Sequence, residues 1–226
     1  MKGYPTYPSS RAYFEQVAAL VGDLDAQTDR FIATLYRGFE EGRTIFLCGN
    51  GGSAAAASHF GQDLAKGTLP SMAATRRFRV VPLTDNIGFI TALANDEGYE
   101  SIFEQQLRNL AREGDLLVAI SGSGNSPNVL RAVEYAHSIG MTTIGVTGFD
   151  GGKLRALAKE SVHIPIDDMG MCEAIHGVVF HAATCSLREA VSLANADLTS
   201  FQGCTVSADE DADTIQLAPG QTYTLA

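Results

Sequence analysis

Thr44-Ile45-Phe46-Leu47-Cys48-Gly49-Asn50-Gly51-Gly52-Ser53, followed by an alanine-rich run that reaches His59, combines a short apolar segment with a glycine-rich turn. The apolar part predicts a strand and the alanine-rich part predicts a helix. The first N–H groups of a helix have no partners within it and lie at the positive end of its dipole. A phosphate or a sugar oxygen can bind there, although most glycine-rich turns only connect elements.

A second turn repeats this arrangement after the apolar residues 115–120. It reads Ile120-Ser121-Gly122-Ser123-Gly124-Asn125-Ser126-Pro127, and proline suits the first position of a helix. Ordinary helix capping by Ser123 or Ser126 needs one hydroxyl, whereas this turn holds three serines within six residues. We therefore expect the hydroxyls and the free N–H groups of the helix to form a cup for phosphate.

Composition limits the class of protein. With 226 residues, 45% of them hydrophobic and 19% charged, the chain can bury one sizeable core, so we expect one domain with at most a short appendage. The net charge of −10 argues against a nucleic-acid partner. No run approaches 18 apolar residues and the N-terminus has no apolar signal core, so we expect a cytoplasmic protein without membrane contact.

Strand and helix patterns alternate through the middle of the chain. The expected strands cover 44–48, 79–83, 115–120, 142–147 and 161–166. The expected helices cover 53–65, 86–94, 99–112, 127–139, 153–158 and 171–195. Short apolar strands that alternate with helices predict an α/β fold, a five-stranded parallel sheet flanked by helices on both faces. Both turns follow strands, so they can share one pocket at the carboxyl ends of the sheet.

The two ends of the chain carry other patterns. Residues 11–41 have apolar side chains three and four apart, which indicates one or two amphipathic N-terminal helices. We assign residues 1–198 to a single domain that includes this helical segment, and 199–226 to a C-terminal extension. The extension holds an acidic run at 209–213 and β-like pieces at 214–217 and 222–225, which favour a hairpin or a flexible tail.

Five motifs, taken together, resemble the sugar isomerase (SIS) domain family. They are Cys48-Gly-Asn-Gly-Gly-Ser, His59-Phe-Gly-Gln-Asp63-Leu, Asn95-Asp96, Ile120-Ser-Gly-Ser-Gly-Asn-Ser, and Glu173-Ala-Ile-His176-x4-His181. The likeness spans roughly residues 14–194 and is greatest to the phosphoheptose isomerase branch, which converts sedoheptulose 7-phosphate to D-glycero-D-manno-heptose 7-phosphate. It implies a flavodoxin-like three-layer SIS fold, a phosphorylated sugar as substrate, and a homotetramer with composite sites.

The resemblance also implies roles for individual residues. Ser121, Ser123 and Ser126 correspond to the residues that hold the phosphate, and Asn50, Ser53 and Asp96 to those that contact the sugar. Gly51, Asn95, Gly122 and Glu173 complete the expected substrate-binding set. Asp63 and His181 correspond to the catalytic acid/base pair. Some members bind zinc through residues that correspond to His59, Asp63, Glu173 and His181, so we expect one Zn²⁺ per subunit.

Helical spacing agrees with such a site, because His59 and Asp63 are four residues apart and Glu173 and His181 are eight apart. Two residues depart from the family. Asp63 replaces a glutamate, which retracts the carboxylate by about 1.5 Å, and a misplacement of about 1 Å can cost on the order of 100-fold in rate. Glu173 replaces a glutamine and adds a negative charge that favours a divalent metal.

Two further departures leave the identity of the sugar open. Gly122 lacks a hydroxyl that is usual in the phosphate cup. Gly170 replaces a family aspartate, with Asp167 and Asp168 close by in the sequence.

Three hypotheses follow. The first is a ketose–aldose isomerase that works through an enediol, with Asp63 or His181 as the base; Asp63 would be a poorer base if it also bound metal. The second is a binding module like the SIS branch that associates with the bacterial replication initiator, which this chain resembles at Thr84-Asp85-Asn86 and Ala94-Asn95-Asp96. The third is an isomerase of another sugar phosphate. The carboxylate at 63 and the imidazole at 181, which the binding branch generally lacks, favour an enzyme.

Overall fold

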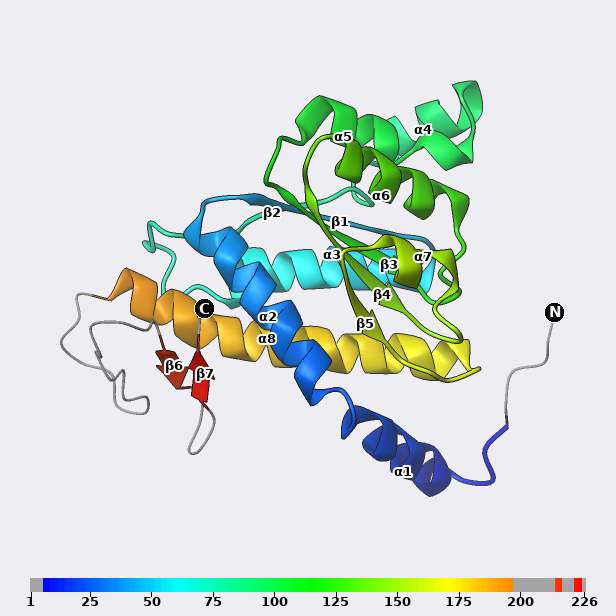
Figure 1. The fold of residues 1–226 in the computed structure, drawn as a ribbon, viewed down its shortest axis with the longest axis vertical. Helices are drawn as coiled ribbons and strands as arrows, with labels where there is room; N and C mark the ends of the chain where they lie inside the picture. Colours follow the sequence, from blue (N-terminus) through cyan, green and yellow to red (C-terminus); the bar gives the residue numbers. More distant parts are fainter. Residues whose placement is uncertain (1–5, 197–213, 217–221, 225–226) are drawn as a thin grey trace.

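A computed structural model describes residues 6–196, 214–216 and 222–224. Its centre is a parallel sheet of five strands in the order β2-β1-β3-β4-β5 (Figure 1). The strands are β1 (Thr44–Gly49), β2 (Arg79–Pro82), β3 (Leu116–Ser121), β4 (Thr142–Thr147) and β5 (Glu160–His163). This confirms the predicted α/β class and sheet.

The last strand is shorter than its apolar pattern. Residues 161–166 were expected to form it, but β5 ends at His163. Pro165 has no N–H with which to continue the ladder. The N–H of Ile166 instead donates to the carbonyl of Ile164 at 2.8 Å, in a tight local turn.

Helices connect the strands and extend the fold at the N-terminus. They are α1 (Ser10–Val21), α2 (Asp25–Glu40), α3 (Gly52–Gln62), α4 (Ile87–Asp96), α5 (Glu104–Leu110), α6 (Pro127–Ser138), α7 (Gly152–Leu157) and α8 (Met169–Asn195). The predicted helix at 99–112 is divided into a 3-10 turn, η2 (Tyr99–Ser101), and α5. The hydroxyl of Ser101 donates to the carbonyl of Gly98 at 2.8 Å, a local bond that competes with helical pairing.

The predicted helix at 53–65 also differs from the pattern. After Gln62 it continues as one π-helical turn, η1 (Asp63–Gly67). π-Helical turns are rare, and they recur at functional sites. Asp63, a predicted site residue, begins this turn.

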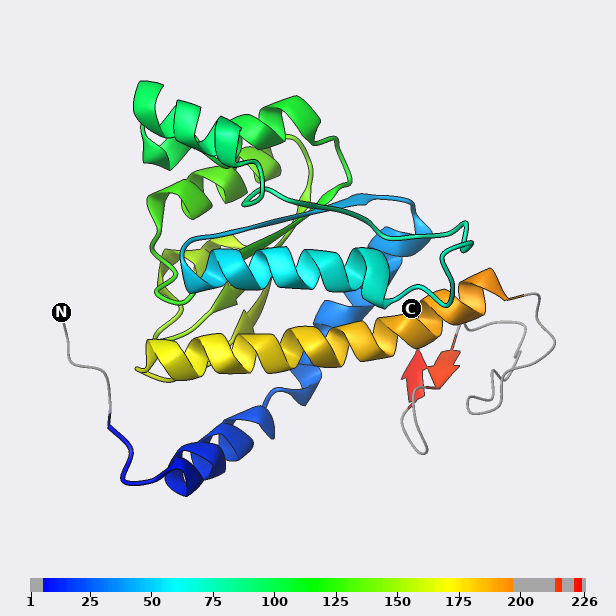
Figure 2. The ribbon, with the colours of Figure 1, turned by 180° about the vertical axis from the view of Figure 1, so that it is seen from behind.

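Helices cover both faces of the sheet, which makes three layers (Figures 1 and 2). Successive side chains of a strand point to opposite faces. Ile45 and Leu47 therefore belong to the core beneath α2, α3 and α8, whereas Phe46 and Cys48 belong to the core beneath α5, α6 and α7. All four side chains are at most 1% exposed, so β1 is the buried centre of the fold.

Two segments lie outside these layers. α1 has no buried residue and projects from one end of the molecule (Figure 1). β6 (Thr214–Gln216) and β7 (Thr222–Thr224) pair antiparallel where the β-like pieces were expected. The predicted boundary at 198/199 lies outside the described residues, so the division into a domain and an extension stays a prediction. Within the described ranges, no helix is both long and apolar enough to cross a membrane.

The strand order decides where a ligand can bind. The chain passes from β1 through α3 outward to β2, and from β3 through α6 in the opposite direction to β4. A crevice therefore opens between the carboxyl ends of β1 and β3, the usual ligand site of open α/β sheets. The glycine turn and the serine turn leave these two strands, and Gly49 pairs in register with Ile120.

Candidate active site

The two turns line one pocket of about 270 Å³, together with the start of α8. Its lining includes eight of the predicted substrate-binding residues: Asn50, Gly51, Ser53, Ser121, Gly122, Ser123, Ser126 and Glu173. Met169, from the first turn of α8, was not predicted to lie there. Residues that are far apart in the sequence thus meet at the crevice.

The serine hydroxyls are not used to cap α6. Ser126 occupies the N-cap position, but its side chain makes no capping hydrogen bond. Its Oγ instead lies 3.1 Å from the Oγ of Ser121. These hydroxyls therefore lie together in the pocket beside the start of α6, which suits an oxyanion such as phosphate.

The glycine turn brings backbone close to a carboxylate. Gly51 has φ +56°, in the left-handed region that favours glycine. A Cβ on Gly52 would lie 2.2 Å from Oε1 of Glu173, so only glycine leaves room for the carboxylate there. Negative charge at the start of α3 is favoured by the helix dipole. Glu173 is thus part of the pocket wall rather than a surface residue.

The structure also explains one departure from the family. A Cβ on Gly122 would lie 2.5 Å from the sulfur of Met169. A serine or threonine at this position would require the end of the flexible Met169 side chain to move. The absence of a hydroxyl at position 122 therefore goes with the present position of Met169.

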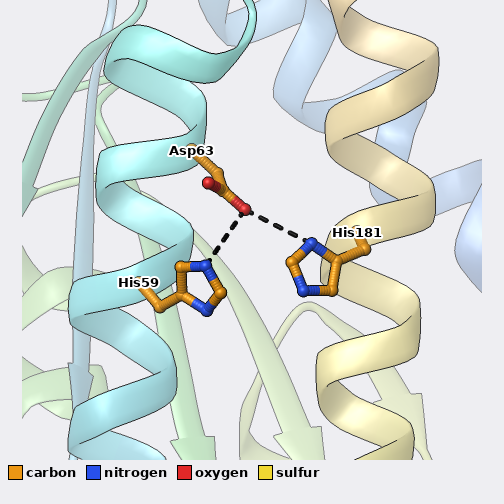
Figure 3. Close-up of side chains that lie close together, drawn as sticks. All are labelled: His59, Asp63 and His181. Atoms are coloured by element: carbon orange, nitrogen blue, oxygen red, sulfur yellow. Dashed lines mark ion pairs between the residues drawn. The ribbon is translucent and has the colours of Figure 1, made fainter.

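A second cluster lies further along α3 and α8. The Oδ2 of Asp63 is 3.7 Å from Nε2 of His59 and 3.4 Å from Nδ1 of His181, and the two rings meet edge to face at 5.1 Å (Figure 3). The side chain of Asp63 is 16% exposed, whereas those of the histidines are 57% and 59% exposed. The less exposed carboxylate of Asp63 therefore lies between two solvent-accessible imidazoles.

These three side chains suit a metal ion. One ligand atom from each lies within 4.8 Å of the others. Imidazole nitrogen and carboxylate oxygen are the usual zinc ligands, and catalytic zinc sites keep one position open beside three protein ligands. Glu173, the fourth predicted ligand, is not in this cluster, because its carboxylate lies at Gly52.

Asn95 and Asp96 lie apart from both places. They end α4, where Nδ2 of Asn95 donates to Oδ1 of Asp96 at 2.7 Å, and both are exposed. Neither lines the pocket between the two turns. Their predicted contact with the sugar stays a prediction.

Two neighbours of Asn50 were missed by the sequence reasoning. Asn128, which is 2% exposed, exchanges two amide hydrogen bonds with Asn50, and the hydroxyl of Tyr99 contacts the same side chain. Asn128 lies two residues after Ser126, so its place in the serine motif was the available signal.

His176 belongs to the motif on α8 but lies inside the fold. It is 1% exposed, its Nε2 lies 3.3 Å from the carbonyl of Thr147, and burial lowers its pKa to about 4. A neutral, buried imidazole of this kind packs the core and does not face a ligand.

Comparison with known proteins agrees with this geometry. The family model described as SIS domain matches residues 12–148. A phosphoheptose isomerase of Aliarcobacter butzleri is 35% identical over 176 residues, which cover 78% of this chain and 91% of the relative. The chain belongs to the SIS domain family.

Two further similar proteins are phosphoheptose isomerases. The phosphoheptose isomerase of Mycobacterium tuberculosis is 40% identical over 157 residues, which cover 68% of this chain and 75% of the relative. The solved structure of phosphoheptose isomerase GmhA from Neisseria gonorrhoeae is similar with a TM-score of 0.71 at 31% identity, over 79% of this chain and 96% of that one. These findings confirm the resemblance predicted from the motifs.

Proposed function

We propose that this SIS protein is a ketose–aldose isomerase that converts sedoheptulose 7-phosphate to D-glycero-D-manno-heptose 7-phosphate. The observation that carries the proposal is the pairing of two sites along α3 and α8. The pocket between the two turns lies at the start of α3 and α8, and the His59, Asp63 and His181 cluster lies further along these helices. The relatives named phosphoheptose isomerase support this substrate.

The separation of the two sites suits a long sugar. His59 follows Gly52 by seven residues on α3, and this corresponds to about 10 Å along a helix. An extended seven-carbon chain reaches about 8 Å and its phosphoester bonds add roughly 2–3 Å. With the phosphate in the pocket beside Gly52, the other end of the sugar would reach toward His59.

Isomerisation needs a group that moves a proton between two neighbouring carbons and donors that stabilise the developing oxyanion. We assign the proton transfer to His181. Its Nδ1 faces Asp63, and its other ring nitrogen is directed away from the carboxylate (Figure 3). In the metal-free protein, Asp63, which is the less exposed partner, would hold the orientation of the ring.

The cup would supply orientation. Ser121, Ser123 and Ser126 would hold the phosphate, so the reacting carbons stay at a constant distance from His181. Asn50, Ser53 and Glu173 line the same pocket and would contact sugar oxygens. Another phosphorylated ketose of similar length would fit the same arrangement. Such ketoses are the second candidate class of substrate.

In its metal-bound form, the proposal has one zinc ion per subunit held by His59, Asp63 and His181 in place of the Asp63–His181 pair, so that the nitrogen of His181 on the metal carries no proton. When bound there, zinc would supply Lewis-acid polarisation of a carbonyl oxygen. Glu173 is assigned to the sugar rather than to the metal, because its carboxylate contacts the start of α3. A homotetramer and a cytoplasmic location complete the proposal and rest on the family resemblance.

The test is turnover of sedoheptulose 7-phosphate by purified protein, metal-free and with added zinc, with direct detection of the aldose product. His181→Gln should abolish turnover and leave binding of inorganic phosphate unchanged. The matched control is His137→Gln, which alters a histidine on α6 that bonds Thr143. Full activity of His181→Gln would remove His181 from the mechanism. Absence of product in wild-type protein under both conditions would contradict the proposal.

A further inference from the structure

Asn50, which lines the pocket, is held by a small network of side chains. Its Nδ2 donates to Oδ1 of Asn128 at 2.9 Å, and Nδ2 of Asn128 donates to its Oδ1 at 2.8 Å. The hydroxyl of Tyr99 donates to the same Oδ1 at 3.0 Å. These bonds connect three elements, because Asn50 follows β1, Tyr99 lies in η2 and Asn128 lies in α6.

A backbone group sets the direction of this network. The N–H of Val129 donates to Oδ1 of Asn128 at 3.0 Å, and it shares that hydrogen with the carbonyl of Ser126. A backbone N–H can only donate, so the oxygen of the Asn128 amide must face it. The NH₂ group of Asn128 must then face Asn50, and Oδ1 of Asn50 must be the acceptor.

This direction of the network determines which hydrogens of the Asn50 amide remain available. Its Oδ1 receives hydrogen bonds from Asn128 and Tyr99, while its Nδ2 donates one of two hydrogens to Asn128. The pattern leaves one N–H of Asn50 available to a ligand, and Asn50 lines both the pocket between the two turns and a neighbouring pocket of about 360 Å³ beside Tyr99 and Asn128. Rotation of the amide by 180° would place oxygen against oxygen and nitrogen against the Tyr99 hydroxyl.

We propose that Asn128 and Tyr99 are positioning residues that hold Asn50 as an N–H donor toward a hydroxyl oxygen of the sugar phosphate. This inference rests on the proposed function, since it names the sugar as the group that Asn50 meets. Asn128 is 2% exposed, so its amide groups cannot turn to water. It also lies two residues after Ser126, which ties the orientation of Asn50 to the phosphate cup.

The test is a double-mutant cycle with Tyr99→Phe, Asn128→Asp and Asn50→Ala in the full-length chain. Tyr99→Phe removes one donor from an exposed ring, and we expect kcat/KM to fall about 3- to 10-fold. Asn128→Asp keeps the acceptor for Val129 and places a second oxygen against Oδ1 of Asn50, for which we expect a loss on the order of 100-fold. Tyr135→Phe is the matched control, because it removes a tyrosine hydroxyl on the same helix as Asn128 but away from the pocket.

Coupling to Asn50 separates positioning from a merely structural role. In the Asn50→Ala background, Tyr99→Phe and Asn128→Asp should each change kcat/KM by less than about twofold. The Kd of inorganic phosphate should stay unchanged in Tyr99→Phe. Equal losses in both backgrounds, or no loss from Tyr99→Phe in the wild-type background, would overturn the inference. The same double-mutant cycle can be measured with calorimetric Kd values for sedoheptulose 7-phosphate, which do not require turnover. If the wild-type protein binds this sugar but does not convert it, only the proposed function is contradicted.

Discussion

Substitution of Gly52 by alanine should lower activity with little change in stability. The new Cβ would lie 2.2 Å from Oε1 of Glu173, whereas ordinary contacts begin at 3.4 Å, so the carboxylate must move by at least about 1.2 Å. A shift of about 1 Å in a substrate-positioning group can cost on the order of 100-fold in rate. We therefore expect kcat/KM for sedoheptulose 7-phosphate to fall about 100-fold.

Stability should behave differently, because the colliding atoms are the end of a flexible side chain. Gly52 has no left-handed backbone conformation, and Gly→Ala at a compatible position stabilises by about 0.4–1 kcal/mol. The free energy of unfolding in urea should thus stay within about 1 kcal/mol of wild type. Gly88→Ala, in the first turn of α4 with no atom within 4 Å of its Cβ, is the matched control and should retain full activity. A Gly52→Ala enzyme within twofold of wild type would refute a role of Glu173 in the pocket.

Three other outcomes are expected. Ser126→Ala should raise the Kd of inorganic phosphate about 10-fold by calorimetry, with an unchanged Tm because its hydroxyl caps no helix; unaltered binding would contradict the cup. Zinc at about 100 times its Kd should add about 2.7 kcal/mol to the free energy of unfolding, and His59→Ala should lose this shift; equal shifts in both proteins would place the metal elsewhere. Because burial lowers the pKa of His176 to about 4, the unfolded chain takes up that proton first. The contribution of His176 to the free energy of unfolding should therefore fall by on the order of 3 kcal/mol from pH 7 to pH 4 and stay constant above pH 7; an equal slope in His176→Gln would show that this histidine makes no such contribution.

The sequence predicted the sheet because its strands are short apolar runs between turns. Residues 142–147 form the strand that the pattern indicates, and the other strands differ by one or a few residues at their ends. The ends were harder to predict because local bonds decide them. The turn at Ile164 and Ile166 ends β5, and the bond from Ser101 to Gly98 divides a predicted helix.

The candidate site was predicted where one element carries several of its groups. The serine turn and the His59 and Asp63 pair are each local in sequence, so spacing alone places them together. Glu173 and His181 share α8, yet the spacing of eight residues allows them to serve different sites. Contacts with other segments decide which site each residue belongs to. Glu173 lies against Gly52 at the start of α3, whereas His181 pairs with Asp63.

By itself, the sequence determined the α/β class, the glycine-rich and serine-rich turns after two strands, and the chemistry of the residues available to them. These features depend on apolar periodicity, glycine and serine placement, and helical spacing, all of which act over a few residues. Only the tertiary structure decided that the two turns share a pocket, that Asn128 and Tyr99 orient Asn50, and that Glu173 lies apart from the histidines. The reason is physical: such contacts depend on strand order and on side chains that meet from distant elements, for which no local pattern exists.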